Sequence, residues 1–301
     1  MNILQGHGFA EPALRDVIYG PFPRNRLDVY PPGPMEGKAP VVLFFHGGSW
    51  RKGDKRLYRW LGRALAWRGF LAVIPNYRLF PHAAFPVFME DAAMAVAWTR
   101  THAPLYGGDP GRIHVMGHSA GAYMVTLLGL DADYLQAAAL SPSDLCSVIG
   151  ISGPYSMDPL ADEDVRPVFE GTPDLERVKP INFVNGEAPP MLLLHGGRDV
   201  LVPARQADLL HGALTELGGA ARKVVYPALG HIEIVLTLTP FYRWRAPVLS
   251  DVVEFLRAPE GAEGAGIAEA LSLSPSFTQE CAALPADAGP TPHRAGRRWP
   301  P

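Results

Sequence analysis

The feature that most limits the possible folds of this chain is a series of short, continuous apolar runs. These runs are strand candidates at residues 26–30, 41–45, 71–74, 113–116, 147–151, 191–195 and 223–227. Most of them are hydrophobic throughout rather than alternating, which is typical of strands buried on both faces of a parallel sheet. Helical spacing of apolar residues predicts helices between them, over residues 57–68, 86–102, 120–130, 203–217 and 247–257. Strands that alternate with helices predict an α/β domain with a mostly parallel sheet, flanked by helices.

The composition changes near Ala258, where the chain becomes rich in Gly, Ala, Pro and Ser. A segment of this kind buries too little apolar surface to offset the entropy that it would lose on ordering. We therefore predict one folded domain over residues 10–257 and a disordered, flexible tail over residues 258–301. A single α/β domain of this size is ordinary.

Charge and targeting signals exclude several classes of partner. The formal net charge of −3 argues against nucleic acid or an anionic membrane as the main partner. No apolar run approaches the length of a membrane-spanning helix, and the N-terminus lacks the pattern of a signal peptide. Two cysteines, Cys146 and Cys281, cannot form a disulfide framework. We predict a cytoplasmic protein with no nucleic-acid or membrane partner; a homodimer is compatible with the sequence.

A five-residue motif, Gly117-His118-Ser119-Ala120-Gly121, fits the pattern G-x-S-x-G. It follows an apolar run and precedes a predicted helix, which is the context of a nucleophile elbow. Glycines leave room for the sharp turn, and the free N–H groups at the start of the helix favour an oxyanion there. A Gly/Ser turn in which the serine only caps the helix would give the same letters.

A second glycine-containing stretch, "LFFHGGSW" at residues 43–50, leaves another predicted buried strand. A glycine pair allows backbone N–H groups to approach a bound oxygen closely, as in the HGGG-type loops of esterases. We predict an oxyanion hole formed by the N–H groups of Gly48, Ser49 and Ala120, with Gly47 as the alternative donor.

A general base and its orienting acid are expected after later strands. Asp199 follows the run 191–195, and His231 follows the run 223–227. Both lie beyond the carboxyl ends of their strands, where open α/β sheets gather their functional groups. The order Ser119, Asp199, His231 is that of one of the convergent serine hydrolase triads. We predict that His231 removes the proton of Ser119 and that Asp199 fixes the tautomer of His231.

Other ionisable residues near these motifs have simpler interpretations. His46, His118 and His195 are interpreted as packing or hydrogen-bonding residues near the site. Glu233 is close to His231 in the sequence but follows it, whereas the acid of the predicted triad precedes the histidine. No spacing of His, Cys and Asp suggests a zinc site, so we predict no bound metal.

Taken together, the motifs resemble the carboxylesterase branch of the α/β-hydrolase superfamily. They are "FFHGGSW", "NYRLFPHAAFP", "YGGDPGRIHVMGHSAGAYMV", "HGGRDVLVP" and "LGHIEIV". The most similar groups are bacterial esterases, arylformamidases and isoprenylcysteine methylesterases, and the resemblance spans about residues 14–257. It implies the α/β-hydrolase fold with an eight-stranded sheet, and hydrolysis through an acyl-serine without a cofactor. Where one branch of the superfamily has a third glycine, this chain has Ser49 followed by Trp50, a pattern closer to that of arylformamidases.

A short connection of about forty residues between two predicted strands leaves room for a short cap but not for a large lid. Candidate pocket residues, each of which would serve equally well in the core, are Trp50, Phe80, Phe85, Tyr155, Met157, Phe169 and Phe183. An open pocket with aromatic walls favours small or aryl esters with short acyl groups. The alternatives are an arylformamidase that acts on N-formylkynurenine-type amides, and a non-catalytic binding protein on a hydrolase fold.

Overall fold

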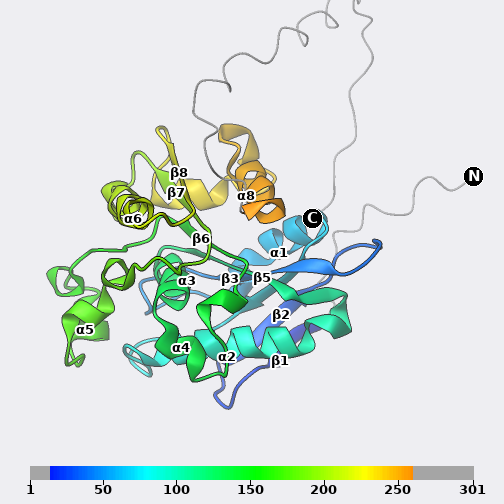
Figure 1. Ribbon diagram of the computed structural model, residues 1–301, viewed down its shortest axis with the longest axis horizontal. Coiled ribbons are helices and arrows are strands. Elements are labelled where there is room, and N and C mark those ends of the chain that lie inside the picture. Colours follow the sequence, from blue (N-terminus) through cyan, green and yellow to red (C-terminus); the bar gives the residue numbers. More distant parts are fainter. Residues whose placement is uncertain (1–13, 260–301) are drawn as a thin grey trace, which may run out of the picture. The chain divides into compact units, whose positions relative to one another are not determined.

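The computed structural model describes residues 14–259 (Figure 1). Within this range the strands form one eight-stranded sheet in the order β1-β2-β4-β3-β5-β6-β7-β8. Their bounds are β1 Leu14–Ile18, β2 Arg26–Tyr30, β3 Ala39–Phe45, β4 Leu71–Pro75, β5 Gly108–His118, β6 Ser147–Ile151, β7 Met191–Gly196 and β8 Ala221–Tyr226. Only β2 runs antiparallel to its neighbours β1 and β4, while the pairs from β4 through β8 are parallel. The predicted α/β fold with a mostly parallel eight-stranded sheet is confirmed.

Helices cover both faces of this sheet and make three layers. The α-helices are α1 Arg59–Ala66, α2 Val87–His102, α3 Ala120–Leu130, α4 Ala132–Gln136, α5 Arg166–Phe169, α6 Arg205–Glu216, α7 His231–Leu236 and α8 Val248–Arg257. One core cluster joins the sheet to α2, α3 and α6, and a second joins its other face to α1, α7 and α8. In Figure 1, α1 and α8 lie above the sheet and α2 lies below it.

Strand β3 shows why the apolar runs are continuous. Val41, Leu43 and Phe45 belong to one core cluster, whereas Val42 and Phe44 belong to the other. Successive side chains of a strand point to opposite faces, so a strand covered by helices on both sides needs apolar residues at every position. All five residues are fully buried.

Every strand and helix that the sequence predicted is present, although the ends of most of them differ by a few residues. The structure adds one strand, β1, and three short α-helices, α4, α5 and α7. The predicted strands 26–30 and 147–151 and the predicted helix 120–130 have the bounds that the structure gives. β1 was not predicted because it is an edge strand whose residues are exposed or only half buried. The short helices α4, α5 and α7 were also missed, since each is too short to show a helical period.

The described residues end just past the predicted domain. Helix α8 ends at Arg257, so the predicted tail falls outside the described residues except for its first two positions. Residues 10–13 of the predicted domain lie outside them too. None of the helices between residues 14 and 259 combines the length and the hydropathy of a membrane-spanning segment.

Candidate active site

The three residues of the predicted triad lie at the carboxyl ends of parallel strands. Ser119 stands between β5 and α3, Asp199 follows β7, and His231 is the first residue of α7, after β8. Because β5, β6, β7 and β8 are successive neighbours in the sheet, these strand ends lie together. Loops from three separate parts of the sequence therefore converge on one site.

Ser119 occupies a strained turn between its strand and its helix. Its backbone has φ 55° and ψ −119°, a conformation that L-residues rarely adopt. A Cβ on Gly117 would lie 2.2 Å from the carbonyl oxygen of Gly121, and a Cβ on Gly121 would lie 2.1 Å from that of Phe45. Both positions therefore require glycine. The Ser119 side chain makes no capping hydrogen bond to α3, so it does not serve merely as a helix cap.

The side chains of Ser119, His231 and Asp199 form one hydrogen-bonded series. His231 Nδ1 lies 2.8 Å from Asp199 Oδ2, and His231 Nε2 lies 2.9 Å from Ser119 Oγ. A carboxylate only accepts hydrogen bonds, so Nδ1–H donates to it, and Nε2 is left to accept the hydroxyl proton of Ser119. In this tautomer the imidazole can remove the serine proton.

Several donors hold the Asp199 carboxylate. Its Oδ1 accepts from the backbone N–H of Val202 at 2.8 Å and of Leu201 at 3.1 Å. His195 Nε2 lies 3.5 Å from Oδ2 and 2.8 Å from the carbonyl oxygen of Val202. Burial by itself raises the pKa of this carboxyl, but hydrogen bonds from His195, His231 and the Val202 N–H hold it well below its ordinary value. The carboxylate therefore stays charged and can stabilise an imidazolium at His231.

Two backbone N–H groups beside Ser119 are free to bind a negatively charged oxygen. Ser49 and Ala120 line the cavity at Ser119, and neither N–H donates a hydrogen bond to any residue between 14 and 259. Gly48, the third predicted donor, is not among the residues that line the cavity. It has φ 126°, and a Cβ there would lie 2.1 Å from the carbonyl oxygen of Lys52, so Gly48 shapes the turn that presents Ser49.

The cavity at Ser119 has a volume of about 280 Å³. Its apolar walls are formed by Trp50, Tyr123, Pro154, Met157, Pro159, Val165, Phe169, Val178, Leu201 and Val202. Its charged lining consists of Lys52, Asp158, Asp162 and Asp164. The cavity thus combines an apolar interior surface with acidic groups from the segment between β6 and α5.

The geometry of this site fits the similarity of the chain to known proteins. The BD-FAE family pattern matches residues 27–214, which is more than half of the chain and includes Ser119 and Asp199. The chain belongs to the BD-FAE family.

Curated relatives of this BD-FAE chain are named as esterases. It is 32% identical to the "Probable isoprenylcysteine alpha-carbonyl methylesterase ICMEL1" of Oryza sativa subsp. japonica, over 84% of this chain and 64% of the relative. It is 34% identical to "Esterase LipC" of Mycobacterium tuberculosis, over 64% of this chain and 53% of that protein. The chain therefore spans less than two thirds of the length of these relatives.

Solved structures share the fold of the BD-FAE chain. A truncated carbohydrate esterase from gut microbiota superposes with a TM-score of 0.70 at 20% identity, covering 84% of this chain and 98% of that one. The apo form of Thermogutta terrifontis esterase 2 gives a TM-score of 0.67 at 24% identity, covering 85% and 95%. The predicted resemblance to the esterase branch of the α/β-hydrolase superfamily is confirmed in family and fold.

Four of the predicted pocket residues do not line the cavity of the BD-FAE chain. Phe80 lies beneath the guanidinium of Arg51, whose Cζ is 5.2 Å from the ring centroid. Tyr155 is fully buried against Gly150 and Gly153, whose missing side chains leave room for its ring. Phe85 and Phe183 pack against the larger core cluster, which apolar side chains at loop ends join as readily as they join a pocket.

The other three predicted pocket residues, Trp50, Met157 and Phe169, do line the cavity. The contacts of Trp50 explain how it is held there. Its ring is 4% exposed and meets the rings of Tyr123 and Phe169 edge-on, each at a centroid distance of 5.0 Å. Trp50 directly follows Ser49 in the sequence. The packing of its ring against Tyr123 and Phe169 therefore fixes the loop that carries the free N–H group of Ser49. Met157 completes the predicted set.

Sequence reasoning missed the acidic lining and Tyr123. Asp158 and Asp162 each accept a hydrogen bond from the backbone two residues ahead, at 2.9 Å, as residues in turns commonly do. Tyr123 lies one helical turn after Ser119, which is the signal that could have identified it, because residues four apart share a helix face.

His118 connects the turn that carries Ser119 to His231. Its Nε2 lies 3.0 Å from the carbonyl oxygen of His231, and the two ring centroids are 4.9 Å apart. Burial lowers the pKa of His118 to about 3, so its ring is neutral near neutral pH and Nε2–H can donate to that carbonyl. The residue before Ser119 therefore holds the backbone of His231, the candidate base.

Replacing His118 by leucine is expected to lower kcat about tenfold while KM stays nearly unchanged, because an unpaired buried acceptor costs about 1–3 kcal/mol and His231 would lose its position. The His118→Gln variant keeps a donor at similar reach and should recover most of the activity. Steady-state kinetics of both variants on p-nitrophenyl acetate check this. A leucine variant with unchanged kcat, or a glutamine variant as impaired as leucine, would show that His118 does not position His231.

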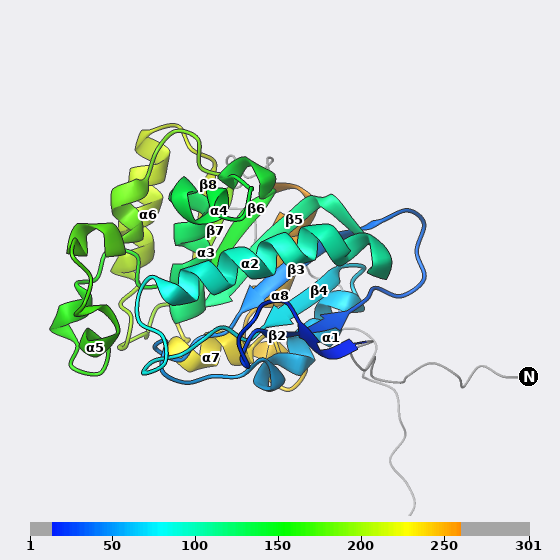
Figure 2. The same ribbon diagram turned by 90° about the horizontal axis from the view of Figure 1, so that it is seen from below.

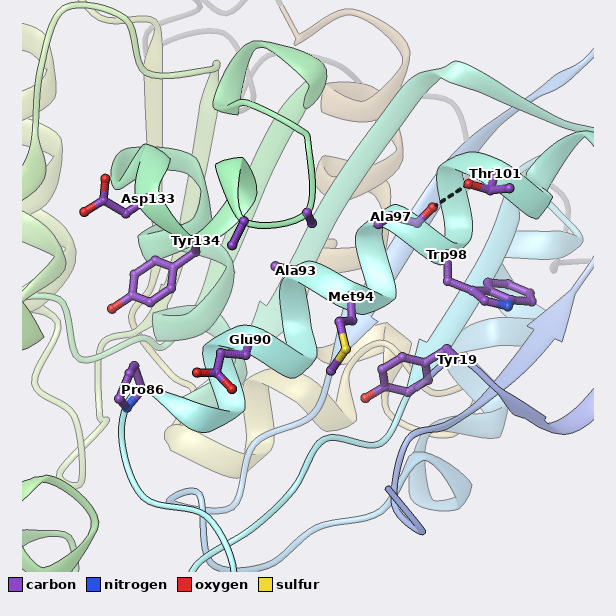
Figure 3. A pocket seen from close by; sticks show the side chains of 12 residues that line it. Tyr19, Pro86, Glu90, Ala93, Met94, Ala97, Trp98, Thr101, Asp133 and Tyr134 are labelled. Carbon is purple, nitrogen blue, oxygen red and sulfur yellow. Dashed lines mark hydrogen bonds between the residues drawn. The ribbon is translucent and has the colours of Figure 1, made fainter. Parts of the chain in front are cut away.

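A larger hollow of about 690 Å³ lies elsewhere, along the outer side of α2 (Figure 3). Met94, Trp98 and Tyr134 contribute to its lining, together with Tyr19 near the end of β1. Its lining includes Thr101, Glu90 and Asp133 but no histidine, serine or cysteine. The Thr101 hydroxyl donates to the carbonyl oxygen of Ala97 at 3.1 Å, so the hollow shows no nucleophile paired with a base. Size alone would therefore have pointed to the wrong part of the molecule.

Proposed function

We propose that this BD-FAE chain is a serine carboxylesterase that hydrolyses small or short-acyl esters through an acyl-enzyme at Ser119. The observation that carries the proposal is the hydrogen-bonded series from Ser119 through His231 to Asp199 at the wall of the cavity. Free N–H groups at Ser49 and Ala120 line the same cavity. A nucleophile, a base, an oriented acid and an anion-binding pair are the groups that acyl transfer needs.

In the first half of the reaction, Ser119 Oγ attacks the ester carbonyl carbon while His231 Nε2 takes its proton. The negative charge that forms on the carbonyl oxygen is stabilised by the N–H groups of Ser49 and Ala120. His231, now an imidazolium paired with Asp199, returns the proton to the departing alkoxide oxygen. The ester C–O bond breaks, the alcohol leaves, and the acyl group remains on Ser119.

In the second half, water replaces the alcohol. His231 removes one proton from the water as it attacks the acyl carbon, and the same N–H pair stabilises the oxyanion. The bond to Ser119 Oγ then breaks, and the imidazolium gives its proton back to the serine. The products are the carboxylic acid and the free enzyme, and the two halves together consume one ester and one water and release the alcohol and the acid.

The relatives support this chemistry. The plant relatives are named as methylesterases and the mycobacterial relative as an esterase. Thermogutta terrifontis esterase 2 has been solved after phosphorylation by paraoxon. Because paraoxon esterifies activated serines, we expect the same reagent to modify this chain.

The cavity size predicts a preference for short acyl groups. A water-sized group occupies about 30 Å³, so a cavity of about 280 Å³ holds an acetyl or butyryl group but not a palmitoyl chain. We expect kcat/KM for p-nitrophenyl acetate and butyrate to exceed that for the palmitate ester by about 100-fold or more, since the longer chain leaves much of its apolar surface in water. A preference for palmitate would contradict the assignment of this cavity.

An amide substrate added to the same experiment distinguishes the proposed esterase from the main alternative. N-formylkynurenine turnover comparable with ester turnover would reassign the chain as an arylformamidase, which uses the same groups. Turnover of neither class would favour a non-catalytic binding protein.

A further inference from the structure

The segment that follows α7 exposes three aromatic side chains in one turn. Phe241 is 85% exposed, Tyr242 43% and Trp244 81%. A single exposed aromatic residue is unremarkable in a folded protein, but a group of large apolar side chains at one place marks an interaction surface. We refer to residues 240–246 as the aromatic loop.

Hydrogen bonds hold the backbone of the aromatic loop and the indole of Trp244 in place. The indole Nε1–H of Trp244 donates to the carbonyl oxygen of Phe241 at 3.1 Å. The backbone N–H of Arg243 donates to Thr239 at 3.1 Å, and that of Arg245 donates to Tyr242 at 3.0 Å. The rings are therefore displayed by an ordered turn, which limits the entropy that binding would cost.

Basic residues accompany the rings. The Arg245 guanidinium lies 5.9 Å from the centroid of the Trp244 ring. Glu233 Oε1 lies 3.9 Å from Arg245 Nη2, so this carboxylate offsets only part of the positive charge of Arg245. Arg243 donates through Nη2 to the carbonyl oxygen of Leu238 at 3.3 Å, which keeps its guanidinium beside the loop.

A second exposed indole and two more arginines belong to the same surface. Trp67, just past the end of α1, is 83% exposed, and the guanidinium of Arg68 lies 5.5 Å from the centroid of its ring. Burial is the main cause that lowers the pKa of Arg68, and repulsion from the charges of Arg243 and Arg257 adds to it. The helices involved, α1, α7 and α8, cover the same face of the sheet (Figure 2).

We propose that the aromatic loop, with Trp67 and Arg257, binds the surface of an anionic lipid bilayer. Tryptophan and phenylalanine rings insert at the boundary between headgroups and acyl chains, where an indole can keep its N–H hydrogen-bonded. Arginines beside them attract anionic headgroups. This inference departs from the sequence-based expectation of no membrane partner, which rested on net charge and apolar run length rather than on local surface.

A second copy of the chain fits this surface less well. A symmetric dimer places the same patch on both sides of the interface, so it would bring Arg245 and Arg257 of one copy against those of the other. That repulsion opposes self-association, whereas a bilayer that contains anionic lipids neutralises it.

Lipid binding would bring the cavity close to the bilayer. His231 opens α7 and lines the cavity, while the aromatic loop begins four residues after the helix ends. A helix of six residues is about 9 Å long. A lipid-bound molecule would therefore hold its candidate active site near esters that partition into membranes.

The test is binding of the full chain to vesicles, measured by co-sedimentation. Vesicles of phosphatidylcholine alone are compared with vesicles that also contain phosphatidylglycerol. The wild type should bind the anionic vesicles, more weakly at high salt, and should bind the neutral vesicles at least tenfold more weakly. The double variant Phe241→Ser/Trp244→Ser should bind the anionic vesicles at least tenfold more weakly than the wild type.

A matched control removes two exposed leucines elsewhere, as Leu105→Ser/Leu217→Ser, and should bind like the wild type. All these variants should keep the far-UV circular dichroism spectrum and the thermal unfolding midpoint of the wild type, which verifies folding without reference to hydrolysis. Because sedimentation does not depend on turnover, the Ser119→Ala variant should bind vesicles normally, and failure of the proposed function would leave this result intact.

Three outcomes would overturn the proposal. The first is no binding of the wild type to anionic vesicles, and the second is equal binding by the aromatic double variant. The third is a wild-type dimer in analytical ultracentrifugation that the double variant abolishes, without vesicle binding, which would assign the surface to a second copy.

Discussion

Replacing Ser119 by alanine is expected to lower kcat for p-nitrophenyl acetate by about 10⁵-fold or more. The reason is that the variant retains the cavity and the N–H groups of Ser49 and Ala120 but has no oxygen that can form the acyl-enzyme. Removal of the nucleophile disables the whole series, so a further His231→Ala change should cost little more. Stopped-flow and steady-state measurements on the single and double variants check both expectations.

The matched control is Ser143→Ala, which removes the hydroxyl of an exposed serine. The Oγ of Ser143 lies 2.8 Å from the Oγ of Ser141. It should leave kcat and KM unchanged. If Ser119→Ala retained more than about a hundredth of the wild-type kcat, well above the residual rate of triad variants, the chemistry would have to use another nucleophile.

The Asp199→Asn variant is expected to lose about 10⁴-fold in kcat with little change in fold or KM. The amide can turn its NH₂ toward His231 Nδ1, 2.8 Å from the present carboxylate oxygen. The imidazole would then carry its proton on Nε2, where it faces Ser119 and can no longer accept the hydroxyl proton. The loss would therefore come from the wrong tautomer rather than from a missing side chain.

Glu233→Gln provides the comparison for this variant, because Glu233 is the other acid near His231 in the sequence. Its Oε2 accepts the N–H of Gly230 at 2.8 Å, where it caps the start of α7. We expect near-normal kcat and a small loss of thermal stability from the weakened cap. Greater impairment of kcat in Glu233→Gln than in Asp199→Asn would reverse the assignment of the acid.

The positions of the triad could be predicted because each member lies in the stretch that follows a strand of the parallel part of the sheet. Runs of apolar residues before Ser119, Asp199 and His231 identified the strands, and parallel strands end on the same side of a sheet. What the sequence could not give was the distance between the side chains, since this depends on the order β5-β6-β7-β8 in the sheet. Strand order arises from crossovers that no local pattern encodes.

The pocket was predicted less well than the triad, for a physical reason. An aromatic side chain at the end of a strand gains by burial whether it faces a cavity or the core, so composition does not separate Trp50 from Tyr155. The two differ in their neighbours: Trp50 packs against Tyr123 and Phe169, whereas Tyr155 fills the space above two glycines. Such contacts join residues that are far apart in the sequence.

The most direct test of the acyl-transfer mechanism is to locate the covalent adduct after treatment with paraoxon. Peptide mass spectrometry should find one diethylphosphoryl group, on the peptide that contains Ser119, in step with loss of ester hydrolysis. The adduct should be absent from Ser119→Ala and should form much more slowly in His231→Ala. An adduct on a different residue, or complete inhibition with Ser119 unmodified, would contradict the assignment of Ser119 as the nucleophile.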